Sequence, residues 1–222
     1  MNYYSEKEIR DIVASVIAQE NLKTKNNCTI CREPIPVEVS ARHVHLTEAA
    51  VEKLFGKGYK LTKKRDLSQP GEFLSGERVK LVTQYGEIAN VAVLGPTRKH
   101  VQVELSQTDT RKLGIKVPMR LSGNLTGGAD MLIIGPAGIL EANECTIVAQ
   151  AHIHMTPADA KKYSVRDGQR LAVRLQTERP LTLESVIVRV KEASQLAVHI
   201  DFDEANAAMV DETTTGIIIE CR

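Results

Sequence analysis

Two histidine pairs of the form His-φ-His-φ-Thr, where φ is an apolar residue, occur in the sequence. The first runs from His43 to Thr47, and the second, 109 residues further on, runs from His152 to Thr156. Each pair ends a β-rich run, and successive side chains of a strand point to opposite faces, so the two imidazoles of a pair share one face. Imidazoles at positions i and i+2 of a strand can bind one metal ion, and histidine is a common zinc ligand.

Two further segments repeat this context with one candidate ligand each. Glu104 is followed by Ser106, and His199 is followed by Asp201. Ser, Thr and Asp are good helix N-caps, and in three of the four segments an acidic residue follows three places after the cap. The sequence therefore predicts four strand–cap–helix units that present six candidate metal ligands, which are His43, His45, Glu104, His152, His154 and His199.

A single His-x-His pair on a strand is usually a surface or packed pair, and only the repetition favours a metal site here. Six ligands exceed what one tetrahedral zinc ion with an open position needs, so we expect two metal ions. Zinc is the first choice, and other divalent ions stay open because imidazole binds several of them.

The composition sets limits on the class of protein. A length of 222 residues allows one large or two small domains. The net charge of +1 gives no sign of nucleic-acid binding by bulk electrostatics. We expect no membrane span, because the longest apolar run, 131–140, is broken by Gly and Pro, and no secretory signal, because the N-terminus is charged.

Residues 1–20 are predicted to form an amphipathic helix that begins at a capping box of Ser5 and Glu8. Its apolar stripe consists of Ile9, Ile12, Val13, Val16 and Ile17. The helix could pack on its own protein or dock on another one, and the polar linker at 21–33 favours docking. This linker contains Cys28 and Cys31. A redox or zinc role would need a thioredoxin-like unit or a second ligand pair nearby, and the sequence indicates neither, so an incidental pair is favoured and the role stays open.

Many short strand-like runs with few long helices predict a mainly β fold, of barrels or sandwiches with short helices. The 109-residue offset indicates two similar halves whose ligand strands face a common cleft. We expect Arg98, His100, Gln102 and Glu104 to alternate on one strand face, which would place Arg98 beside the metal in a position suited to phosphate. The loop at 118–128, with Arg120, Ser122 and Gly123, has a composition suited to an anion.

Taken together, these motifs resemble the phosphate propanoyltransferases, the PduL family of phosphotransacylases. The resemblance covers about residues 35–216 and rests on linked motifs at 40–46, 95–98, 103–106, 118–123 and 151–155. It implies a reversible reaction in which acyl-CoA and phosphate give acyl phosphate and free CoA. It also implies two zinc ions in a cleft between two β-barrels that are capped by short α-helices.

The resemblance also implies a role for individual residues. One zinc would be held by His43, His45 and Glu104, the other by His152, His154 and His199, and Arg98 would bind phosphate. The barrels would be interleaved, with 34–41 and 150–222 in the first and 42–149 in the second. Some family members carry an N-terminal peptide that directs them into bacterial microcompartments through shell or core proteins. Residues 1–20 look like one, so we expect this lumen as the location, with the cytoplasm as the alternative.

Two other functions remain open at this stage. A dizinc hydrolase acting on a thioester or phosphate ester would use the same ligands, and dependence on added phosphate would separate the two enzymes. A non-catalytic shell or adaptor component with structural metal ions is less well supported, because structural zinc sites are closed and rich in cysteine. No nucleophilic Ser or Cys stands beside a base, so direct attack of phosphate is expected. The acyl chain length, the microcompartment type and any homo-oligomer are not determined by the sequence.

Overall fold

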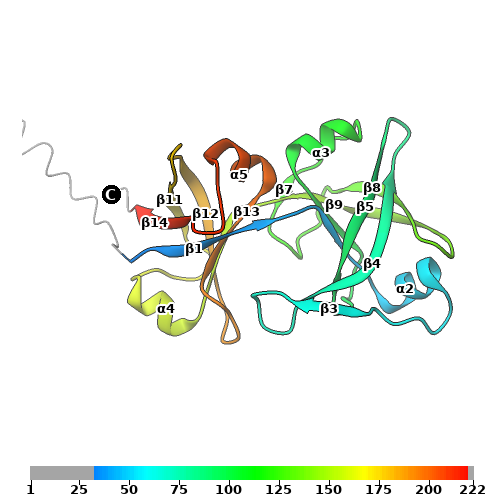
Figure 1. Ribbon diagram of the computed structural model, residues 1–222, viewed down its shortest axis with the longest axis horizontal. Helices are drawn as coiled ribbons and strands as arrows, with labels where there is room; N and C mark the ends of the chain where they lie inside the picture. Colours follow the sequence, from blue (N-terminus) through cyan, green and yellow to red (C-terminus); the bar gives the residue numbers. More distant parts are fainter. Residues whose placement is uncertain (1–32, 220–222) are drawn as a thin grey trace, which may run out of the picture.

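The computed structural model describes residues 33–219. The predicted helix at 1–20 lies outside this part of the chain, as do Cys28, Cys31 and nearly all of the linker at 21–33. Within it, the prediction of a mainly β protein built from two barrels with short helices is confirmed (Figure 1).

The first barrel is a closed ring of six strands that takes one strand from the beginning of the described chain and five from its end. Strand β1 pairs in parallel with β13 and antiparallel with β14, and this pairing closes the ring. In ring order the strands are β1 (Ile35–Ser40), β13 (Ala197–Asp201), β10 (His152–Met155), β12 (Thr182–Val190), β11 (Arg170–Gln176) and β14 (Thr215–Ile219).

The second barrel is built from the middle of the chain and closes because β8 pairs with both β4 and β9. Two short strands are added to this sheet beyond the ring: β3 (Lys63–Asp66) pairs with β4, and β7 (Met119–Arg120) pairs with β9. In ring order the six strands are β4 (Phe73–Val82), β5 (Glu87–Gly95), β2 (His43–His45), β6 (Gln102–Leu105), β9 (Ile139–Ala149) and β8 (Ala129–Ile134).

A short helix follows each strand that carries candidate ligands, as the sequence predicts. The helices in the described chain are α2 (Glu48–Phe55), α3 (Gln107–Lys112), α4 (Pro157–Lys162) and α5 (Phe202–Ala208). Their N-caps are Thr47, Ser106, Thr156 and Asp201, and the last three form full capping boxes. Each cap satisfies N–H groups that the first helical turn leaves free, which fixes where the chain turns away from the site.

Each barrel has its own aliphatic core, and the ligand strands contribute to it between their histidines. Val44 lies between His43 and His45 and is fully buried, and Ile153 is equally buried between His152 and His154. Burying such a side chain contributes about 1.5–3 kcal/mol. Because strand side chains alternate, anchoring the apolar residue in the core turns both histidines of the pair to the outside of the barrel.

The two barrels lie side by side, and β1 runs along the first of them toward the second in Figure 1. Side chains join them at several points. Gln69 and Gln195 form a reciprocal pair, in which Gln69 Nε2 donates to Gln195 O over 3.0 Å and Gln195 N donates to Gln69 Oε1 over 3.3 Å. Asp203 of α5 accepts a 2.7 Å hydrogen bond from the backbone N–H of Thr108 in α3. These contacts hold the two barrels against each other.

The expected strand face of Arg98, His100, Gln102 and Glu104 is wrong in its first half. β6 begins only at Gln102, and Arg98 and His100 lie in the preceding loop, with His100 exposed. The sheet order β5–β2–β6 explains the difference: the chain must cross the end of β2 to reach its next strand. The backbone N–H of Arg98 donates to Leu46 O at that crossing, over 2.8 Å.

Candidate metal centre

The first group of candidate ligands consists of His43 and His45 on β2 and Glu104 on β6. The two strands are antiparallel, and His43 stands directly opposite Glu104 in their register. Nε2 of His43 lies 3.7 Å from Oε2 of Glu104, and Nε2 of His45 lies 3.9 Å from Oε1 of the same carboxylate. All three side chains are buried, with at most 7% of their surface exposed.

The second group, His152, His154 and His199, repeats this plan in the other barrel. His152 and His154 lie on β10, and His199 lies on the antiparallel strand β13, directly opposite His152. Nε2 of His152 is 3.0 Å from Nε2 of His154, and the rings of His154 and His199 are 4.7 Å apart, edge to face. The structure thus brings the six predicted residues together in two groups of three, and their binding of metal stays a prediction.

The first histidine of each pair is held in one tautomer by a backbone carbonyl two residues before it. Nδ1 of His43 lies 2.7 Å from Ala41 O, and Nδ1 of His152 lies 2.8 Å from Gln150 O. A carbonyl can only accept a hydrogen bond, so Nδ1 carries the proton and Nε2 keeps a free lone pair. A ring N–H bonded to a carbonyl is the usual support of a histidine that binds metal through its other nitrogen.

The spacing of these atoms fits a metal such as zinc. Zn–N bonds of about 2.0–2.1 Å at tetrahedral angles separate two ligand atoms by roughly 3.3 Å. The separations of 3.0, 3.7 and 3.9 Å lie on both sides of that value. Nε2 of His199 is also buried without a well-formed hydrogen bond, although Oε2 of Glu38 approaches it to 3.2 Å. Buried polar atoms of this kind call for a partner, and a cation would be one.

Burial keeps most of these imidazoles neutral. Burial lowers the pKa of His152 to about 4, and it lowers the pKa of His154 to about 2 with help from the neighbouring His152 and His199. Burial, followed by the charges of His43 and Arg98, also holds the pKa of His45 well below its usual value. Neutral imidazole is the form that binds metal, so these sites need not release a proton first.

The Glu104 carboxylate reverses this trend at His43. Burial opposes a charge on His43, but the adjacent carboxylate raises the pKa of that imidazole overall. Burial by itself would raise the pKa of Glu104, yet His43 and His45 lower it far below the ordinary value. Glu104 is therefore ionised at neutral pH and supplies a negative charge for a cation. Its charge also acts to raise the pKa of His152 in the other barrel, so the two groups lie within electrostatic reach of each other.

Arg98 lies beside the first group in a network of polar side chains. Its Nη2 donates to Oε1 of Glu72 over 2.7 Å, and its Nη1 donates to Oγ of Ser122 over 3.1 Å. Ser122 also accepts from Nε2 of Gln102, which in addition donates to Glu104. Arg98 is thus connected to a candidate ligand through two intervening side chains.

The loop that contains Ser122 is tied to the same network by its backbone. The N–H of Gly123 donates to Oε1 of Gln102 over 2.8 Å. Arg120 is different: within residues 33–219 its guanidinium donates only to its neighbour Met119 O, and it makes no hydrogen bond to either group. Of the three predicted loop residues, the structure brings Ser122 and Gly123 close to Arg98 and the first group.

Glu72 and Glu38 contact the site and were not foreseen from the sequence. Glu72 lies just before β4 and Glu38 lies on the mostly apolar strand β1, neither is part of a motif, and each reaches its partner only through the fold. Gln102 was expected on the same strand face as Glu104, and that alternation was the one signal for its role.

No helix within residues 33–219 is long and apolar enough to cross a membrane.

Comparison with known proteins gives a consistent result. The family model described as phosphate propanoyltransferase matches residues 36–211. A phosphate propanoyltransferase of Priestia megaterium is 47% identical over 214 residues, covering 96% of each chain. One of Alkaliphilus metalliredigens is 44% identical over 97% of this chain and 99% of its own, and one of Lachnoclostridium phytofermentans is 49% identical over 83% and 85%. This chain therefore belongs to the phosphate propanoyltransferase family, which confirms the prediction of an acyltransferase.

Proposed function

We propose that this enzyme transfers a short acyl group, propanoyl or acetyl, reversibly between CoA and inorganic phosphate at a site with two metal ions and an arginine. The observation that carries the proposal is the pairing of two equivalent ligand groups, one on each barrel, with Arg98 connected to the first of them. Family membership supports the same reaction class.

In this proposal His43, His45 and Glu104 hold one zinc ion, and His152, His154 and His199 hold the other. Bound zinc would supply a Lewis acid for the thioester carbonyl and an affinity for thiolate sulfur. The protein's part is to keep His45, His152 and His154 neutral and Glu104 ionised, as the directions of their pKa shifts indicate. Other divalent ions with a preference for imidazole would fit the same donors.

Arg98 is the residue that we assign to phosphate. A guanidinium offers a planar fork that matches two oxygens of a phosphate dianion. One nitrogen of this fork, Nη2, already donates to Oε1 of Glu72, which holds the side chain in place and marks it as able to bind an anion. Ser122 and Gly123 would complete the anion-binding side of the site, and Arg120 would lie at its outer edge.

The described chain supports direct transfer without an acyl-enzyme intermediate. A phosphate oxygen would attack the thioester carbonyl carbon, the C–S bond would break, and CoA would leave as the thiolate. Cys145, the free cysteine within residues 33–219, is buried, and burial raises the pKa of its thiol to about 11. A thiol that stays protonated at neutral pH is a poor nucleophile.

We further propose that residues 1–20 direct the enzyme to the lumen of a bacterial microcompartment by binding shell or core proteins. The relatives from Priestia megaterium and Alkaliphilus metalliredigens match 96% and 97% of this chain. Because 4% of 222 residues is about nine, these matches extend into residues 1–20. We also propose the domain boundaries that the family resemblance implies, 34–41 with 150–222 and 42–149, and the strand order of the two barrels supports this division.

The test is a phosphate-dependence assay on the purified full-length chain. With propanoyl-CoA and inorganic phosphate, we expect free thiol and acyl phosphate to form in equal amounts, at a rate that saturates with phosphate. Without phosphate, thiol release should fall to the background rate. Thiol release that is equally fast without phosphate, with free acid as the product, would identify a hydrolase and reject the proposal.

A further inference from the structure

Arg189 stands next to one of the candidate ligands on the first barrel. Strand β12 runs parallel to β10, and their register places Arg189 directly beside His154. Its neighbours Val186 and Val188 are buried in the core of the barrel. Because strand side chains alternate, Arg189 points to the outer face, the same face that carries His152 and His154.

The guanidinium of Arg189 is half-buried and without a partner in the described structure. Within residues 33–219 it makes no hydrogen bond and no ion pair. The other half-buried arginine of the site, Arg98, uses its nitrogens on Glu72 and Ser122. A cation that is partly removed from water normally has an anionic partner, because its desolvation is otherwise uncompensated.

Charges of the second barrel reach Arg189. Burial lowers the pKa of this guanidinium, the carboxylates of Glu104, Glu72 and Asp167 act to raise it, and Arg98 acts to lower it. Asp167 belongs to the first barrel, and the other three residues belong to the second. Arg189 therefore lies on the outer face of its own barrel within electrostatic reach of Arg98 and Glu104. The two ligand groups are thus flanked by one arginine from each barrel.

We propose that Arg189 binds the phosphoryl group of the substrate, inorganic phosphate in one direction and acyl phosphate in the other, from the side opposite Arg98. The inference rests on the proposed function, since it deepens the same site. Arg98 already uses donors on Glu72 and Ser122, so it cannot contact every oxygen of a phosphate by itself. Arg189 has all of its donors free for this second contact. The phosphates of CoA have the same chemistry, and the test below separates the two sources.

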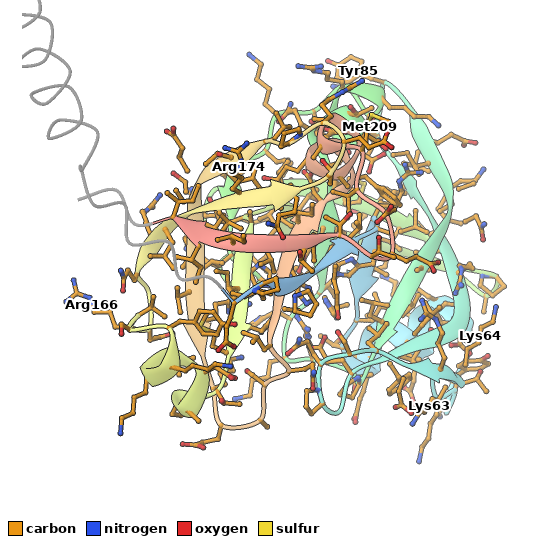
Figure 2. The ribbon with its side chains drawn as sticks, turned by 60° about the vertical axis from the view of Figure 1, so that its left-hand side comes forward. Lys63, Lys64, Tyr85, Arg166, Arg174 and Met209 are labelled. Atoms are coloured by element: carbon orange, nitrogen blue, oxygen red, sulfur yellow. The ribbon has the colours of Figure 1, made fainter. Side chains whose placement is uncertain are left out.

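The experiment compares Arg189→Gln and Arg189→Lys with wild type and with the control variant Arg174→Gln. Arg174 lies on the neighbouring strand β11, where its side chain is exposed (Figure 2). Loss of a charge-assisted hydrogen bond should raise the KM for phosphate roughly 10-fold to 100-fold in Arg189→Gln. Arg189→Lys should restore only part of it, because lysine lacks the fork. The KM for propanoyl-CoA, the zinc content and the Tm should stay near wild type, and Arg174→Gln should change none of these.

Titration calorimetry with inorganic phosphate provides a second readout that does not depend on turnover. We expect the Kd for phosphate to rise by the same factor as the KM. Three results would overturn the inference. An unchanged Kd would mean that Arg189 makes no contact with phosphate, and a rise confined to the KM for propanoyl-CoA would assign Arg189 to CoA. A loss of zinc would make its role structural. If wild type binds phosphate through Arg189 but shows no phosphate-dependent turnover, the proposed function fails while this binding site stands.

Discussion

Glu204→Gln is predicted to remove a pH-dependent loss of stability from the first barrel. Glu204 is the third residue of α5, and its Oε2 accepts a 2.9 Å hydrogen bond from the backbone N–H of Asp201. Burial, together with the charges of Asp201 and Asp203, raises the pKa of Glu204 from 4.5 to about 7, although its hydrogen bond to Asp201 opposes the change. The side chain sits on the helix that follows His199, outside both ligand groups.

The sign and the size of the effect follow from this pKa. Between about pH 4.5 and pH 7 the folded chain keeps a proton on Glu204 that the unfolded chain releases, so the free energy of unfolding falls as the pH rises through this window. The shift corresponds to at most about 3 kcal/mol, and partial solvent contact reduces the expected loss to about 2 kcal/mol. Gln cannot ionise, and its amide oxygen can still accept the hydrogen bond of the capping box.

The assay is urea unfolding of wild type and Glu204→Gln at several pH values between 4.5 and 8, with zinc at a constant excess. Both proteins share every ligand residue, so the pH dependence of metal binding cancels in their difference. The variant should be about as stable as wild type at pH 4.5 and about 2 kcal/mol more stable at pH 8. Stability curves that stay parallel over this range would refute a raised pKa at Glu204.

Four further variants test the assignments of the catalytic body and of the N-terminal segment. Arg98→Lys should raise the KM for phosphate at least tenfold and the KM for acyl-CoA far less, because lysine keeps the charge and loses the planar fork; equal changes in both constants would show that Arg98 is not a specific phosphate contact. Deletion of residues 1–20 should leave turnover close to wild type and abolish co-purification with microcompartments. Ile12→Glu should abolish co-purification in the same way, whereas Lys7→Glu should have little effect on it. A loss of stability or activity on deletion would mean that this segment packs on its own protein.

Local sequence patterns were sufficient to predict the units that build the site. The apolar residue between two histidines, followed by a capping residue, determines a strand with outward-facing imidazoles and a helix after it. Both features depend on neighbours within a few residues, and the capping boxes at Ser106, Thr156 and Asp201 form as expected. The repetition of the unit then indicated two similar halves. The interleaving of the barrels, by contrast, was expected only from the family resemblance, because the pairing of β1 with β13 joins residues far apart in the chain.

The features that the sequence did not predict depend on register or on crossing connections. β3 consists of four exposed polar residues, so it has no alternation to reveal it. Arg98 lies in a loop because the chain must cross the end of β2, a consequence of strand order and not of composition. Glu72 reaches Arg98, and Arg189 stands beside His154, only through contacts between distant segments. None of these contacts leaves a periodic signal in the sequence.

The metal content of the purified full-length chain tests the central claim most directly. Elemental analysis after removal of loosely bound ions should give two equivalents of zinc, or of another divalent metal, per chain. The double variant His43→Ala/His45→Ala and the double variant His152→Ala/His154→Ala should each retain one equivalent and stay folded, because each barrel has its own aliphatic core. Wild-type protein that is fully active with one equivalent or none, or a double variant that keeps both, would contradict the assignment of one metal to each barrel.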